Sequence, residues 1–224
     1  MKKILFHGSS QIVDRPLYGV GKKTNDYGLG FYCTEDIELA YEWAVDSDRD
    51  GYLNTYELDC GHLTILHLDR KEYKILHWLA ILLENRTFNV SNQLASEAKE
   101  YIIKNFSIPY KEYDLIIGYR ADDSYFAFAQ DFLSGSISYQ QLEKAMKLGN
   151  LGKQVVLISP KAFENITFRG YEIAKNSTYY NRKKERDSSA RNTYFESKRA
   201  KRNKGDLFIN QIIDEEMKPD DPRL

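Results

Sequence analysis

The residues of this chain that could bind a small molecule begin near its start. His7 lies where a predicted strand at 3–7 runs into Gly8-Ser9-Ser10. A side chain at a strand end points into the crevice that the next loop opens, and a glycine lets a ligand approach the backbone closely. His7 and Gly8 are therefore candidate binding residues. The alternative is that His7 is an ordinary hydrogen-bonded residue of a turn.

Two aromatic residues could form a slot for a flat ring. Tyr32 ends the segment Tyr27-Gly-Leu-Gly-Phe-Tyr on a predicted strand at 29–34, and Trp43 lies eleven residues later on a predicted helix at 36–46. Aromatic side chains placed on a strand and on the helix that follows it could be the two walls of such a slot. The alternative is that both belong to the hydrophobic core, and their spacing leaves both interpretations open.

Hydrophobic periodicity predicts the elements that would position these residues. Alternation on both sides of Gly61 predicts a pair of strands at 52–59 and 63–68. Further helices are predicted at 72–86, 91–105, 125–133 and 139–147, and further strands at 113–118, 154–159 and 166–174. Because strands and helices do not alternate regularly, an α+β fold with antiparallel or mixed sheets is expected.

The chain is predicted to divide into a domain at 1–175 and a helical extension at 176–224. Between 181 and 204 there are ten basic residues against three acidic ones, which could bind nucleic acid or an acidic partner or could simply face water. Asp206 is a candidate N-cap for a helix at 205–217. The apolar stripe of that helix must dock on something and consists of Phe208, Ile209, Ile212 and Ile213.

Composition limits the class of protein. The chain has 224 residues, 42% hydrophobic and 29% charged, with a net charge of −1. It contains no run of about 18 apolar residues and no signal-peptide pattern, so a cytoplasmic protein without a membrane contact is expected. Cys33 and Cys60 have no CxxC or histidine spacing around them, so both are expected to be reduced and buried, with no metal site.

Several motifs in order resemble a known superfamily. Leu5-Phe-His-Gly-Ser, the segment ending at Tyr32, and Trp43 are similar to the His-Tyr-Glu branch of the ADP-ribosyltransferases, which contains the polymerases. The chain resembles the bacterial DUF3990 group more closely still, and along essentially its whole length. The matching motifs are His7-Gly-Ser, Asp26-Tyr-Gly-Leu-Gly-Phe-Tyr, Tyr113-Asp-Leu-Ile-Ile-Gly-Tyr-Arg-Ala-Asp-Asp, Lys153-Gln154 and Asp220-Asp-Pro-Arg-Leu.

The resemblance implies an ADP-ribosyltransferase-like core, a split mixed or antiparallel sheet with flanking helices, and NAD⁺ as substrate. His7 would hydrogen-bond a ribose hydroxyl, and the Gly8 backbone would pair with the nicotinamide carboxamide. Tyr32 and Trp43 would enclose the nicotinamide ring. The remaining residues implied in binding are Ser9, Gly30 and Phe31.

The chain departs from the superfamily at one position. Gln154 stands where the polymerases have a glutamate, and an amide carries no charge and cannot act as a base. Either Gln154 suffices or another carboxylate reaches the site, for which Asp122 and Asp123 are candidates unless they cap the next helix. The loop residues Lys22 and Lys23 could meet the NAD⁺ pyrophosphate or could be solvated.

These observations lead to an expected function and two alternatives. The expectation is NAD-dependent mono-ADP-ribosyl transfer onto a protein or nucleic acid, by analogy as the toxin of a toxin–antitoxin module with an antitoxin protein as partner. The first alternative is an inactive NAD- or nucleotide-binding module, with Gln154 as the mark of lost catalysis. The second is a nucleic-acid-binding protein that uses the basic segment.

Overall fold

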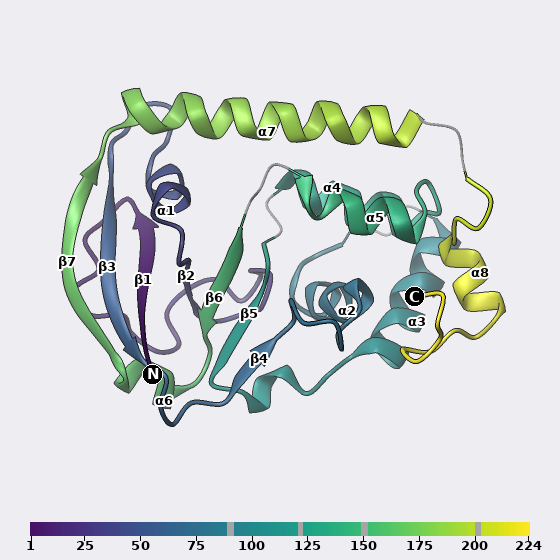
Figure 1. The fold of residues 1–224 in the computed structure, drawn as a ribbon, viewed down its shortest axis with the longest axis horizontal. Coiled ribbons are helices and arrows are strands. Elements are labelled where there is room, and N and C mark those ends of the chain that lie inside the picture. The colour runs from purple at the N-terminus through teal and green to yellow at the C-terminus, as the bar shows by residue number, and fades with distance from the viewer. Residues whose placement is uncertain (89–91, 121–122, 149–151, 200–202) are drawn as a thin grey trace.

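The computed structural model describes residues 1–88, 92–120, 123–148, 152–199 and 203–224. Two β-sheets lie side by side and helices pack around them, and the first sheet lies at the side of the molecule away from its helical half (Figure 1). The first sheet is antiparallel and the second is mixed, so the predicted α+β class is confirmed. Within the described ranges, no helix combines the length and the apolar content that crossing a membrane requires.

The first sheet has the strand order β1 (Lys2–Ser9), β3 (Gly51–Asp59), β7 (Ile166–Ala174). The prediction that β1 stops at His7 is wrong, because Gly8 and Ser9 still pair with Leu53 and Tyr52 of β3. His7 therefore lies inside the strand and pairs with Asn54.

The second sheet has the order β2 (Phe31–Cys33), β6 (Lys153–Leu157), β5 (Leu115–Tyr119), β4 (Ile65–His67). Strands β4 and β5 run parallel, and the other neighbouring pairs run antiparallel. The predicted pairing of β3 with β4 is therefore wrong. The Asp114 carboxylate accepts hydrogen bonds from the backbone N–H and the hydroxyl of Thr64, at 2.8 and 3.1 Å. These bonds hold the start of β4 beside β5, in the other sheet.

In the part of the chain that the structure describes, backbone hydrogen bonds join the two sheets at the pair Phe6 and Thr34, and a shared core lies between the sheets. The Phe6 N–H donates to the Thr34 carbonyl at 2.8 Å, and the Thr34 N–H donates back at 2.9 Å. A buried cluster lies between the sheets and includes Leu5, Leu58, Leu115, Leu157, Cys33 and Cys60. Both cysteines are buried with free thiols, as expected from the sequence.

Helix α1 (Ile37–Ala44) packs very closely on the first sheet. Its N-terminus is capped by Asp36, whose carboxylate accepts from the N–H groups of Glu38 and Leu39. A Cβ at Gly8 would lie 2.0 Å from the Ala40 carbonyl oxygen. The glycine in β1 is therefore required for this close packing of strand and helix.

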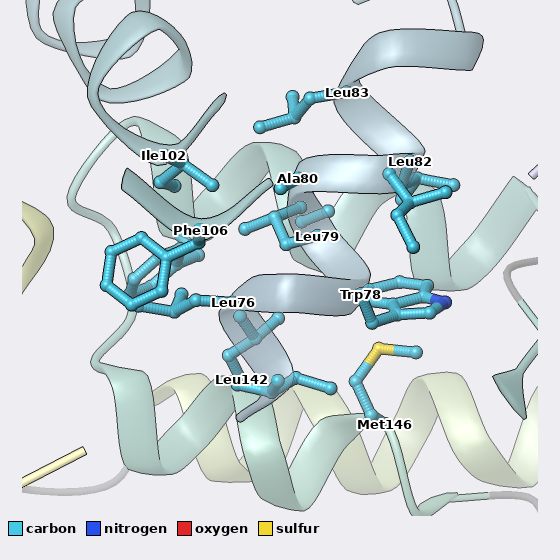
Figure 2. Packing of buried hydrophobic residues seen from close by; sticks show 14 of the residues in the cluster. Leu76, Trp78, Leu79, Ala80, Leu82, Leu83, Ile102, Phe106, Leu142 and Met146 are labelled. Carbon is cyan, nitrogen blue, oxygen red and sulfur yellow. The ribbon is translucent and has the colours of Figure 1, made fainter. Parts of the chain in front are cut away.

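The helical half is built around α2 (Ile75–Asn85), which is apolar on all sides and is buried for that reason. Figure 2 shows Phe106 of α3 (Gln93–Phe106) beside Leu76 of α2, and Met146, next to the end of α5 (Tyr139–Ala145), beside Trp78 on the other side of α2. The remaining short elements of the domain are η1 (Tyr110–Glu112), α4 (Asp123–Leu133) and α6 (Pro160–Glu164).

The C-terminal segment packs on both halves. Helix α7 (Asn176–Arg199) begins beside the first sheet and runs along the molecule past α4 and α5 (Figure 1). Tyr179 stacks on Tyr41 with ring centroids 4.5 Å apart, and Tyr194 stacks on Phe128 at 3.7 Å. Each end of α7 is thus anchored to a different part of the domain.

Helix α8 (Ile209–Asp214) is shorter than the helix predicted at 205–217. The docking that the apolar stripe predicts takes place on the main core, where Ile209 and Ile212 are fully buried. The predicted N-cap is wrong. Phe208 occupies the cap position, and the Asp206 carboxylate instead accepts a hydrogen bond from the Asn203 N–H at 2.7 Å.

Candidate functional site

A cleft of about 830 Å³ opens where the two sheets meet. Its walls come from β1, the loop that leads to β2, β2 itself, α1 and β6. Eight residues singled out in the sequence line it, from four separate segments of the chain: His7, Gly8, Ser9, Gly30, Phe31, Tyr32, Trp43 and Gln154. Residues far apart in sequence thus converge on one cavity.

His7 is held in one orientation and one tautomer. Its Nδ1–H donates to the Tyr32 carbonyl oxygen at 2.7 Å, and its ring lies 4.5 Å from that of Phe31. Burial lowers the pKa of His7, and the bond to Tyr32 offsets this only in part. The neutral ring with Nδ1 protonated leaves Nε2 as a hydrogen-bond acceptor.

Tyr32 contributes a fixed ring to the cleft. Its hydroxyl donates to the Gly28 carbonyl at 2.7 Å and accepts from the Tyr27 N–H at 3.1 Å. Burial raises the pKa of Tyr32, so the phenol stays protonated. Gly28 has a φ of +73°, a left-handed conformation that a glycine adopts without strain.

Trp43 reaches the cleft from α1. Its Cβ lies on the side of the helix that packs against Gly8. Its Nε1–H is buried and has no hydrogen-bond acceptor among the residues that the structure describes. The guanidinium carbon of Arg120 lies 4.4 Å from the centroid of the indole ring. This distance is that of a cation–π contact.

Gln154 lies on β6 opposite Gly118 of β5, and its side chain is a buried polar group in the cleft wall. The residue is only 5% exposed, and its Oε1 has no hydrogen-bond donor within the described part of the chain. An unsatisfied buried carbonyl oxygen costs about 1–3 kcal/mol. A ligand that donates to Oε1 would recover this free energy.

Lys22, a candidate from the sequence, also lines the cleft, and the other charged groups of its wall were not among the predicted residues. Arg86, at the end of α2, forms an ion pair with Asp26, with 2.8 Å between Nε and Oδ1. Arg120 follows β5 directly. Asp26 and Arg120 lie inside two of the motifs that resemble the DUF3990 group, but the sequence assigned neither of them a role in binding. No local sequence pattern distinguishes Arg86.

The proposed acidic pair at 122–123 cannot be placed in the cleft. Asp122 lies outside the described residues, and Asp123 is the first residue of α4, with a side chain that is likewise outside them. The carboxylate that does line the cleft, among the described residues, belongs to Asp26.

At the N-terminal end of the basic segment, several cationic side chains contact the domain. Arg182 pairs with Glu38 at 2.9 Å and Arg186 with Glu42, both on α1. The Lys183 ammonium donates to the Val45 carbonyl at 3.1 Å, and burial lowers the pKa of this lysine. These cations therefore attach α7 to the helix that carries Trp43.

Comparison with known proteins places the chain in a family. A family model described as "Protein of unknown function (DUF3990)" matches residues 3–168, which include every described cleft residue named above. No curated protein and no solved structure matches the chain. Because the matched region covers more than half of its length, the chain belongs to the DUF3990 family.

Proposed function

We propose that this protein is an NAD-dependent mono-ADP-ribosyltransferase that modifies a macromolecule. The observation that carries the proposal is the convergence of His7, Tyr32 and Trp43 on one cleft, from β1, β2 and α1. These are the three residues that the resemblance to the ADP-ribosyltransferases assigns to the ribose and the nicotinamide ring.

The polar atoms of the cleft fit such a substrate. His7 Nε2 accepts a hydrogen bond from one ribose hydroxyl, and Gln154 Oε1 accepts from another. Tyr32 and Trp43 offer aromatic surfaces to the nicotinamide. The Gly8 backbone, beside His7, faces the carboxamide. A sugar held by these contacts is oriented before the glycosidic bond breaks, which lowers the entropic part of the barrier.

In the proposed reaction the bond between the ribose C1′ and the nicotinamide nitrogen breaks, and neutral nicotinamide leaves with the electron pair. An acceptor oxygen or nitrogen then bonds to C1′ and loses its proton to solvent or to a base of its own. Gln154 polarises the ribose hydroxyl without removing its proton. The product is therefore a single ADP-ribose unit, because chain extension needs a base at the ribose.

A second candidate function is a nucleotide-binding module without catalysis. It is favoured by Gln154, which carries no charge, and by the engagement of Asp26 with Arg86 in an ion pair. In that case the cleft would bind NAD⁺ and release no nicotinamide.

The test is nicotinamide release from NAD⁺, followed by labelled NAD⁺ and a cell lysate to detect a modified acceptor. We expect release by the purified protein and loss of release in His7→Ala. His62→Ala is the matched control, because His62 is exposed on the loop between β3 and β4 and does not line the cleft. Binding without release would favour the second candidate, and normal turnover in a folded His7→Ala protein would refute the role of His7.

A further inference from the structure

Helix α7 contacts α1, the helix that carries Trp43, through two ion pairs that differ in burial. Arg182 pairs with Glu38 at the surface, where both side chains are more than half exposed. Arg186 pairs with Glu42 one helical turn further along both helices, where the side chains are only 18% and 10% exposed. Solvent and salt screen a buried ion pair much less than an exposed one. The pair of Arg186 and Glu42 is therefore the contact through which α7 can act most strongly on α1.

The Glu42 carboxylate interacts with two guanidinium groups from different parts of the chain. Burial raises the pKa of Glu42, and the charges of Arg186 on α7 and of Arg120 after β5 oppose that shift. Arg120 in turn lies over the indole ring of Trp43, with 4.4 Å between the guanidinium carbon and the ring centroid. These contacts connect α7, through Glu42 and Arg120, to an aromatic wall of the cleft.

The two aromatic walls of the cleft are held in different ways. The Tyr32 hydroxyl donates to the Gly28 carbonyl at 2.7 Å, which fixes the phenol ring at its far end. The Trp43 Nε1–H has no acceptor among the described residues, so no hydrogen bond to that part of the chain fixes the indole ring. The orientation of Trp43 therefore depends on packing, and the guanidinium of Arg120 is one of the groups that cover its face.

We infer that Arg186 is a positioning residue of the cleft: it holds the Glu42 carboxylate, which holds Arg120 against Trp43 and so fixes the angle of this wall. Helix α7 is then part of the binding machinery, although no described residue of α7 lines the cleft. The ligand for which the wall is held rests on the proposed function. The dependence of the Trp43 ring on Arg186 does not, and it can be measured without any ligand.

The experiment labels the full chain with fluorotryptophan and records fluorine NMR spectra. The chain has 2 tryptophans, so Trp43 gives one resonance and Trp78, buried in the core of the helical half, gives the other. The spectrum of Trp43→Phe assigns them. Arg186→Gln removes the charge, and Arg186→Lys keeps it. Arg182→Gln is the matched control, because Arg182 forms the exposed ion pair between the same two helices.

In Arg186→Gln we expect the Trp43 resonance to move toward its position in the urea-unfolded protein, while the Trp78 resonance stays in place. Arg186→Lys should give an intermediate position, and Arg182→Gln should leave both resonances unchanged. If Arg186→Gln does not fold, the double variant with Glu42→Gln replaces it, because removing both partners leaves no unpaired buried charge. A Trp43 resonance that stays in place in the folded variant would overturn the inference.

If the protein releases nicotinamide from NAD⁺, Arg186→Gln should raise the KM for NAD⁺ about threefold or more and change kcat less, because a displaced wall weakens binding. An unchanged KM would overturn the role of Arg186 in binding. If Arg186→Gln moves the Trp43 resonance and no nicotinamide is released, the positioning of Trp43 stands and the transferase proposal fails. If nicotinamide is released and Arg186→Gln moves neither the resonance nor the KM, the transferase proposal stands and the positioning role fails.

Discussion

At the scale of the residue, burial sets the protonation state of His7 and predicts a pH dependence. The pKa of His7 lies below its ordinary value of 6.5, because desolvation disfavours the imidazolium. We expect nicotinamide release to be constant above pH 6.5 and to fall at lower pH, when protonation of Nε2 removes the acceptor. A pH profile of release measures this, and a rate that rises on acidification would contradict it.

The same shift affects stability with a defined sign. The folded state binds the His7 proton less readily than the unfolded state, so His7 contributes stability above pH 6.5 that is lost as pH falls through its lowered pKa. Free energies of unfolding of the unmodified protein and of His7→Gln should therefore converge on acidification.

Gln154 leads to a second residue-scale prediction. The unmodified protein should attach single ADP-ribose units, and Gln154→Glu should raise NAD⁺ hydrolysis by about tenfold or more, because a carboxylate can act as a base at the ribose. Gln11→Glu, at an exposed position outside the cleft lining, is the control for the added charge. A ladder of polymer from the unmodified protein on a denaturing gel would refute the first part, and an unchanged rate in the variant would refute the second.

Motif reading could find His7, Tyr32, Trp43 and Gln154, since each lies in a segment whose glycines and aromatic residues stand out. It could not find Arg86, because an arginine after an apolar helix has no distinguishing local pattern. Its partner Asp26 lies sixty residues earlier in the chain, and only the folded structure brings the two together.

At the scale of the element, the contact between β1 and α1 predicts a large effect of a single methyl group. Gly8→Ala would place Cβ 2.0 Å from the backbone oxygen of Ala40, so the strand or the helix must move. We expect a loss of about 1–3 kcal/mol in the free energy of unfolding. In Gly61→Ala, the new Cβ meets the Asp59 carboxylate at 3.2 Å and the stability should change little. Equal melting temperatures for the two variants would contradict the prediction.

Element types were predictable because they follow from local periodicity, and β7 has the predicted bounds. Strand pairing was not, because it depends on contacts distant in sequence. The alternation around Gly61 favours a hairpin. In the structure, however, Thr64 donates two hydrogen bonds to the Asp114 carboxylate, and these bonds hold the start of β4 in the other sheet. Asp206 likewise has the residue type of an N-cap, but its carboxylate binds the Asn203 N–H before α8 begins.

At the scale of the whole molecule, the C-terminal segment is part of the core. Ile212 of α8 is fully buried in the same cluster as α2 and α3, so Ile212→Ala should cost about 2–5 kcal/mol. Ile173→Ala is the matched control, because Ile173 is 55% exposed on β7. Denaturant unfolding measures both variants, and an unchanged midpoint for Ile212→Ala would show that the helix does not support the fold.

The junction of the two sheets has a consequence for motion. Within the described residues, the backbones of the sheets are hydrogen-bonded at the pair Phe6 and Thr34, directly beside His7 and Cys33. Because a buried core also packs between the sheets, they do not turn freely about this pair, and opening of the cleft would require that core to repack. The amide protons of Phe6 and Thr34 would be among the last to exchange with solvent, while those of the loop at 10–30 exchange early.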